Sequence, residues 1–225
     1  IDSDGYIDRA WSNLKSYFLQ AAYVDDNTLI KVLTFGGHEK TYQAWYGVTK
    51  DEMETLGRTY NPYSYENEID NYKQDHYQFH WNQKLNEKWS TNLGLNHTYG
   101  RGYFEQFRED DSIDIYGGIL VSDIDQQGNQ TGTTDLIRRR WLDNNFYVLN
   151  ASVNYKTSKL DLIFNSSYST YSGDHYGEVI WARNFSKNSS VRDRYYDGNG
   201  KKTDFSVFAK ASYLLNEKLE FYGDL

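Results

Sequence analysis

Polar and apolar residues alternate with a period of two along most of this chain. In the clearest stretch, Tyr72 to Leu85, one parity is polar and the other carries mostly apolar rings. The apolar parity recurs in four later segments as Trp89, Leu93, Leu95 and Tyr99, as Tyr147, Leu149, Ala151, Val153 and Tyr155, as Leu160, Leu162, Phe164 and Tyr168, and as Phe205, Val207, Ala209, Ala211 and Tyr213. Because strand side chains point alternately to two sides, the pattern predicts β-strands with one apolar face. An earlier pair, Leu14 to Val24 and Thr28 to Trp45, alternates less cleanly, and its faces stay unassigned.

Two kinds of connection alternate between these segments. The short ones are turn-forming triplets at Asp25 to Asn27, Asn86 to Lys88, Thr157 to Lys159 and Asn216 to Lys218. The long ones run from about Tyr46 to Asn71, Glu109 to Ile137 and Gly177 to Lys202. Strict alternation places all tight turns at one end of the strands and all long loops at the other. The sequence therefore predicts an antiparallel up-and-down meander of about eight long strands.

A soluble β-sandwich and a membrane barrel both contain alternating strands. The predicted strands run roughly 12 to 18 residues, whereas strands average about 5 to 6 in soluble proteins. Loops above about 12 to 15 residues are uncommon in compact domains. A transmembrane β-barrel combines long strands, short turns at one end, long extracellular loops and aromatic girdles. The pattern therefore favours an all-β fold that forms part of a larger transmembrane β-barrel.

The amino-acid composition excludes several classes of structure and partner. Tyr, Phe and Trp make up 17% of the 225 residues, and Pro occurs once, at Pro62, where an average usage of about 5% predicts roughly eleven. No apolar run exceeds four residues, which excludes a transmembrane helix of about 20. The absence of Cys excludes disulfides and thiolate chemistry, and a net charge of −8 argues against nucleic acid as a partner.

Two segments carry a resemblance to a known family. Ser3 to Ala10, and Thr34 to Trp45 after the first turn, resemble the barrel region of TonB-dependent outer-membrane receptors, particularly those of Bacteroidetes. The stretch from Gly36 to Trp45 is the most specific part, and the meander is similar over essentially all of the chain. The resemblance implies a barrel of about 22 strands around an N-terminal plug, which imports a scarce nutrient with energy passed on by TonB.

The sequence departs from that family in length. It begins at Ile1, ends at Leu225 within an alternating segment, and holds neither a plug nor a TonB-contacting segment. Residues 1–225 are therefore expected to be a partial barrel, with the plug and the remaining strands absent from this chain.

The resemblance also implies a location and partners. These are the cell outer membrane, its lipid and lipopolysaccharide, the TonB complex through the missing N-terminal region, and a small-molecule ligand. A ferric siderophore or similar metal chelate is the expected nutrient, and no cofactor is implied. A passive porin, another outer-membrane β-barrel, and a surface adhesion or structural β-protein without transport are the alternatives.

The first long loop holds the richest candidate chemistry. Thr49 to Glu52 is a capping-box pattern that predicts a short helix ending near Gly57. The candidate ligand-binding residues around it are Trp45, Tyr46, Arg58, Tyr60, Tyr63 and Tyr65. Such rings offer rigid contact area with a polar tip, and Arg offers a charge for an anionic ligand. The alternative is that the rings pack the loop together or lie at the membrane interface.

Arg138 to Arg140 begin the fifth long strand. By parity with Asn150 and Ser152, Arg138 and Arg140 are expected to face the lumen near its outer mouth, where they would attract an anionic ligand. A solvated loop end is the alternative, as is pairing of the outward Arg139 with lipopolysaccharide phosphate.

Other motifs favour structural roles. His76 and His80 share a face, but positions i and i+4 of a strand lie about 13 Å apart, too far for one metal ion. Asp123 to Gly128 resembles the start of a calcium loop, but Thr134 stands where its closing Glu belongs, and Asp197 to Gly200 is shorter still. Both segments favour turns. No nucleophile, phosphate-loop or zinc motif is present, so the sequence makes no case for an enzyme.

Overall fold

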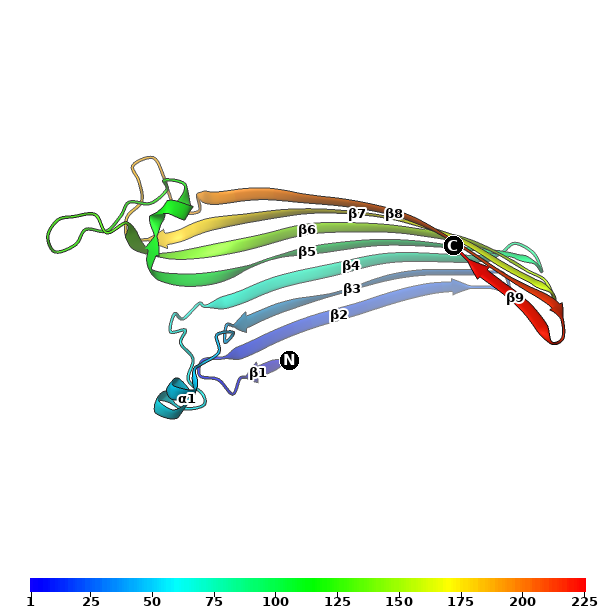
Figure 1. Cartoon of the computed structure of the whole chain (residues 1–225), viewed down its shortest axis with the longest axis horizontal. Coiled ribbons are helices and arrows are strands. Elements are labelled where there is room, and N and C mark those ends of the chain that lie inside the picture. The colour runs from blue at the N-terminus through cyan, green and yellow to red at the C-terminus, as the bar shows by residue number, and fades with distance from the viewer.

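A single antiparallel sheet makes up almost the whole molecule (Figure 1). The computed structural model describes all residues from 1 to 225. The nine strands hold about two thirds of the residues, and each strand pairs only with its neighbours in sequence. The predicted up-and-down meander is confirmed.

The elements follow one another in simple order. The strands are β1 (Asp2–Asp4), β2 (Trp11–Val24), β3 (Thr28–Tyr42), β4 (Ile69–Lys84), β5 (Trp89–Ser112), β6 (Thr133–Lys156), β7 (Leu160–Ala182), β8 (Arg194–Asn216) and β9 (Leu219–Asp224). The helix α1 (Lys50–Leu56) and the 3₁₀ helix η1 (Ile113–Tyr116) lie in the first two long loops. Neither helix has the length and apolar character needed to cross a membrane.

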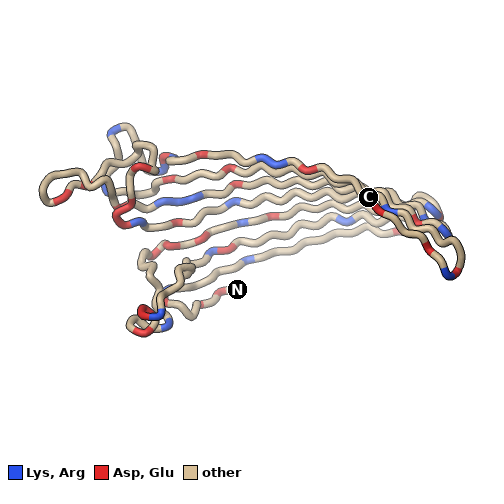
Figure 2. Tube along the Cα trace, viewed as in Figure 1, with Lys and Arg blue, Asp and Glu red and all other residues tan.

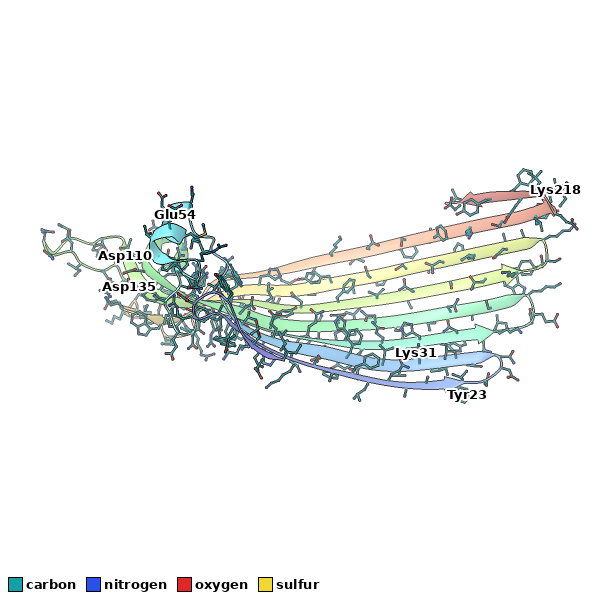
Figure 3. All side chains as sticks on the ribbon, turned by 90° about the horizontal axis from the view of Figure 1, so that it is seen from below. Tyr23, Lys31, Glu54, Asp110, Asp135 and Lys218 are labelled. Atoms are coloured by element: carbon teal, nitrogen blue, oxygen red, sulfur yellow. The ribbon has the colours of Figure 1, made fainter.

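The four short turns lie where the sequence predicts them. In the first turn, the Asp25 carboxylate accepts hydrogen bonds from the backbone N–H groups of Asn27 and Thr28. Figure 3 shows Tyr23 and Lys218 at this end of the sheet and Glu54, Asp110 and Asp135 at the other. Local side-chain capping therefore fixes each hairpin and gathers the long loops at the opposite end.

Strands β5 to β8 are longer than predicted, and the second and third long loops are correspondingly shorter. β5 and β6 have 24 residues each, and these two loops shrink to residues 113–132 and 183–193, whereas the first loop, residues 43–68, keeps its predicted length. The predicted turn at Asp197 to Gly200 is wrong, because these residues pair with Gly173 to Tyr176 inside β8. Polar pairs occupy this part of the ladder, such as Arg101 with Asp143, so hydrophobic alternation ends while strand pairing continues. The turn at Asp123 to Gly128 is present, with the Gly128 N–H donating to the Asp125 carbonyl.

We call the two sides of the sheet the polar face, which carries Tyr72, His76 and Asn150, and the apolar face, which carries Phe79, Leu149 and Val153. The apolar residues cover the half of each strand next to the short turns, where Figure 2 shows few charges before the turns themselves. On strands β4 to β6, this band ends at a row of stacked rings: the centroid of His97 lies 5.9 Å from that of Tyr77 and 4.3 Å from that of Tyr147.

The unassigned faces of β2 and β3 have a simple explanation. Phe18 and Phe35 lie on the polar face, with ring centroids 6.3 Å apart, and Phe35 stacks on His76 at 4.4 Å. Leu19 and Val32 cover the apolar face of the same strands. Apolar side chains on both faces blur the alternation of this pair.

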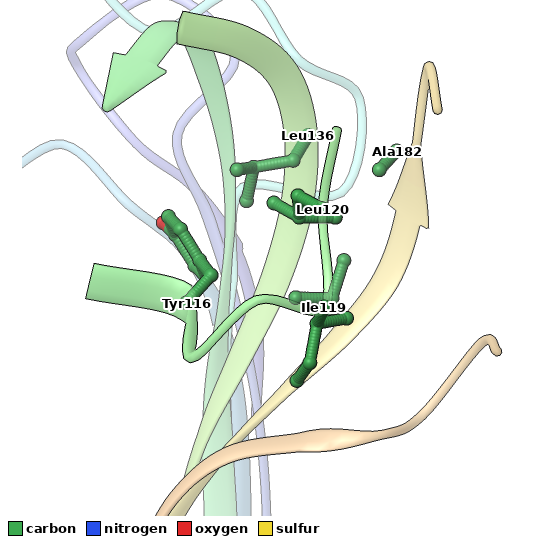
Figure 4. Packing of buried hydrophobic residues seen from close by; sticks show 6 residues of the cluster. Tyr116, Ile119, Leu120, Leu136 and Ala182 are labelled. Carbon is green, nitrogen blue, oxygen red and sulfur yellow. The ribbon is translucent and has the colours of Figure 1, made fainter. Parts of the chain in front are cut away.

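The densest packing lies under the second and third long loops. Only 21 of the 225 residues are buried, because a single-layer sheet leaves both faces uncovered. The buried hydrophobic cluster consists of Tyr116, Ile119, Leu120, Leu136, Val179 and Ala182 (Figure 4). It fastens the loop 113–132 to the outer ends of β6 and β7.

Candidate functional site

The polar face carries a groove in its outer half, across strands β3 to β8. Its volume is about 420 Å³. The residues that line it are Glu39, Asp70, Tyr72, Gly102, Tyr103, Phe104, Arg140, Trp141, Leu142, His175 and Tyr196. A hollow of about 750 Å³ shares Glu39 and Tyr72 with the groove and continues it toward Leu14 and Gln74. Volumes of about 300 to 1,000 Å³ with aromatic walls and a few polar groups are typical of small-molecule sites.

Glycines let two tyrosine rings lie flat in the groove. A Cβ atom on Gly102 would collide with the backbone and ring of Tyr72 on the neighbouring strand. A Cβ on Gly177 would meet the ring of Tyr196 in the same way. The two rings therefore occupy space that only glycine leaves open, which holds them across the adjacent strand.

Arg140 is the basic residue of the groove. Its Nε donates to the Tyr196 hydroxyl over 3.3 Å, and its guanidinium lies 5.4 Å from the Phe104 ring centroid and 5.8 Å from that of Tyr196. Stacking between two rings fixes the direction of a long, otherwise flexible side chain.

The other two arginines of the triplet are engaged within the chain. Arg138 donates to the Tyr116 hydroxyl at 2.9 Å and lies 3.6 Å from an Asp111 carboxylate oxygen, with both charged side chains 13% exposed. Arg139 lies on the opposite face, 2.8 Å from Glu105, as the parity prediction requires. Of the three guanidinium groups, that of Arg140 alone lines the groove.

The aromatic residues of the first long loop separate into different surroundings. Trp45 lies edge-on to Phe104, with centroids 6.1 Å apart, so it extends the groove toward the loop. Tyr46 and Tyr63 form an edge-to-face pair at 5.6 Å. Tyr65 turns to the apolar face, where its hydroxyl donates to Glu105 over 2.7 Å.

The remaining loop candidates lie apart from these. The capping box is present as predicted: Thr49 and Glu52 bond reciprocally, and Gly57 follows the helix. Arg58 is exposed beyond it and Tyr60 is half-buried, and no side-chain hydrogen bond or ion pair joins either to the groove. The candidate residues therefore do not form one cluster; Trp45 and Arg140 meet across Phe104.

Buried polar groups anchor this loop to the sheet. The Gln43 amide donates to the carbonyls of Ile69 and Glu105, and Arg9 donates to the carbonyls of Asn61 and Tyr63. These bonds pair side chains with carbonyls of the loop and of strands β4 and β5, and so tie the loop to the sheet.

Glu68 is the most perturbed acid of the loop. Its side chain is 2% exposed, and its Oε2 accepts from the Phe107 backbone N–H, while Oε1 has no partner. Burial raises the pKa of Glu68 to about 7. Desolvation penalises the ionised form and outweighs the opposing effects of the Phe107 N–H and the Arg108 guanidinium.

The histidines of the polar face form no metal site. His76 bonds to Gln74 and Thr98, and His80 bonds to Gln78. No group of three or more His, Asp or Glu side chains is arranged to hold a metal ion.

Several residues that line the groove cannot be predicted from the sequence. Asp70, Phe104 and Tyr196 lie in the outer halves of three separate strands, and only the register brings them together. Alternation assigns Tyr72 to the polar face, but which strand positions stand opposite one another depends on hairpin geometry and bulges.

The fold is shared with a known receptor. The ferric preacinetobactin receptor BauA from Acinetobacter baumannii superposes with a TM-score of 0.51 at 9% identity, over 100% of this chain and 38% of that protein. The ferric-catecholate import receptor Fiu from E. coli K12, in its closed form, gives 0.45 at 8% identity, over 98% and 44%. No family model and no curated protein sequence matches the chain. The first similarity shows the fold alone, and this chain spans 38% of that receptor's length.

Proposed function

We propose that this chain is the partial wall of an outer-membrane β-barrel receptor that captures a scarce nutrient and imports it with energy from TonB. The observation that carries the proposal is the coincidence of an apolar band at the short-turn end with a ring-lined groove nearer the long loops. A wall that spans a membrane needs an apolar band to contact lipid, and a receptor needs a groove that can hold its ligand.

The ligand class implied by the resemblance is a ferric siderophore or similar metal chelate. The ferric preacinetobactin receptor, which shares the fold, supports a ferric chelate as the ligand. The stacked guanidinium of Arg140 and the rings of Phe104 and Tyr196 offer a charge and flat contact surface to such a ligand.

Uptake by cells that carry the full-length protein tests the function. We expect accumulation of a ferric tris-catecholate or another nutrient to require the protein and to stop when the proton gradient is collapsed or TonB is deleted. Uptake that continues unchanged without TonB would indicate a passive porin instead.

A further inference from the structure

Arg140 has no ion-pair partner within the chain, unlike other arginines on the same strands. Arg140 uses only its Nε for a hydrogen bond within the chain, so both terminal nitrogens remain free for a ligand. Arg101 and Arg139, whose side chains lie on the apolar face of the same strands, are both ion-paired. Guanidinium groups with free terminal nitrogens suit bidentate binding of a carboxylate.

Two carboxylates lie at the other end of the groove. Glu39 and Asp70 both line it, and neither forms an ion pair within the chain. The neighbouring Asp75, on the apolar face, is paired with Lys73 at 2.9 Å. The groove therefore presents unpaired negative charge opposite an unpaired positive charge.

The register sets the spacing between these charges. Asp70 stands opposite Phe104, and Phe104 stands opposite Arg140, so two inter-strand steps separate the acid from the arginine. At about 4.8 Å per step, the two backbones lie roughly 10 Å apart. The Phe104 ring lies between them. A ligand that satisfies both ends needs an ammonium and a carboxylate roughly that far apart, with an apolar body.

We propose that this groove binds a zwitterionic, peptide-like ligand about three residues long, with its carboxylate at Arg140 and its ammonium at Asp70 and Glu39. Extended chain spans about 3.3 to 3.6 Å per residue, so a tripeptide bridges the gap and a single amino acid is too short. A polyanion would meet two carboxylates for one guanidinium, and like charges at a binding surface disfavour the wrong partner. A free peptide and the peptidic chain of a metal chelate both carry these groups. The inference rests on the proposed uptake function and names the ligand of its site.

Calorimetric titration of the full-length protein in detergent tests the assignment. The probes are Ala-Phe-Ala, its C-terminal amide and its N-acetyl derivative. We expect the free tripeptide to bind at least tenfold more tightly than either capped form. Arg140→Gln should remove the preference for the free carboxylate only. The double variant with Glu39→Gln and Asp70→Asn should remove the preference for the free amine only.

Controls separate these effects from misfolding. Lys201→Gln removes a charge from an exposed residue on the apolar face of β8 and should leave all three affinities unchanged. A variant that merely unfolds would lose both preferences together. Equal binding of free and capped tripeptides by the unaltered protein would overturn the assignment. Loss of both preferences in an Arg140→Gln variant that keeps the strand content of the unaltered protein by circular dichroism would overturn it as well.

Two further probes identify the source of the ligand and isolate the underlying function. The first probe is the ferric complex of a linear tripeptide of acetyl-hydroxyornithine, which carries the same terminal charges as Ala-Phe-Ala and also iron. If this complex binds more tightly than Ala-Phe-Ala, the site is assigned to a chelate. If Ala-Phe-Ala binds more tightly, the site is assigned to a free peptide. Binding and TonB-dependent uptake of an anionic ferric tris-catecholate without binding of either tripeptide would reject the zwitterion and leave the receptor function standing. The absence of both binding and energised uptake would reject both.

Discussion

The role of a charged residue in this molecule depends on whether its polar atoms have hydrogen-bond or ion-pair partners within the chain. Arg138, Arg139 and Arg140 are adjacent in sequence, yet Asp111 and Glu105 neutralise the first two and only the third faces the groove with free donors. Parity alone predicts which side of the sheet each arginine faces. It does not predict the partners, because Asp111 reaches Arg138 across a bulge and Glu105 reaches Arg139 through the strand register.

Glu68 gives a pH-dependent prediction at this scale. A buried carboxyl with a pKa raised to about 7 contributes stability that is full below the unfolded value of 4.5 and is lost as the pH rises through 7. Glu68→Gln should therefore raise the free energy of unfolding by about 1 to 3 kcal/mol at pH 8.5 and leave it nearly unchanged at pH 4.5. Urea unfolding of the full-length protein in detergent measures this.

The neighbouring Glu66 supplies the control, because it is exposed in the same loop. Glu66→Gln should show no comparable pH dependence. An equal effect of Glu68→Gln at both pH values would mean that the substitution acts through packing and not through ionisation.

At the scale of secondary-structure elements, motifs within three residues predict the turns and the helix. Such motifs do not predict where the strands end. The Thr49 capping box and the Asp25 turn each depend on residues three apart, which the sequence displays directly. The outer halves of β5 to β8 are held by polar cross-strand pairs, and their residues resemble those of loops. Most of the groove lies in these outer halves, so the sequence identifies only part of its lining.

Helix α1 offers a test of the Thr49 capping box. Thr49→Ala removes the N-cap bond and should cost about 1 kcal/mol of helix stability, which is roughly a fivefold loss of amide protection over Lys50–Leu56. Hydrogen exchange with mass spectrometry measures it. Thr55→Ala, which removes a bond from the Thr55 hydroxyl to the Asp51 carbonyl inside the helix, should leave protection equal or higher because Ala favours helix. Similar losses in both variants would contradict a role for the cap.

The two faces of β6 give the second prediction for an element. Val153 lies on the apolar face within the band, and its neighbour Asn154 lies on the polar face, where it bonds to Ser90. Val153→Arg should lower the free energy of unfolding in a lipid bilayer by about 2 to 4 kcal/mol, while Asn154→Arg should change it by less than about 1. Equal costs on the two faces would overturn the proposed lipid contact.

For the whole molecule, the sheet is an open wall with two free edges. β1 covers only Trp11 to Asn13 of β2, and β9 covers β8 only from Lys210 to Asn216. Unpaired backbone therefore runs along most of β2 and along the outer half of β8, and one face exposes an apolar band. Closing such a wall into a barrel requires further strands.

These edges predict the behaviour of the 225-residue chain on its own. Exposed strand edges pair with other chains, and a large apolar face drives the same association, so the isolated chain should form oligomers or aggregates in detergent-free buffer. Light scattering after size-exclusion chromatography measures this, with the full-length protein in detergent as the monodisperse reference. A stable monomer with native strand content in plain buffer would show that the edges and the apolar face are covered within the chain. That result would favour a soluble β-protein over a membrane wall, because a wall of this kind has no way to bury both edges and its band without lipid or further strands.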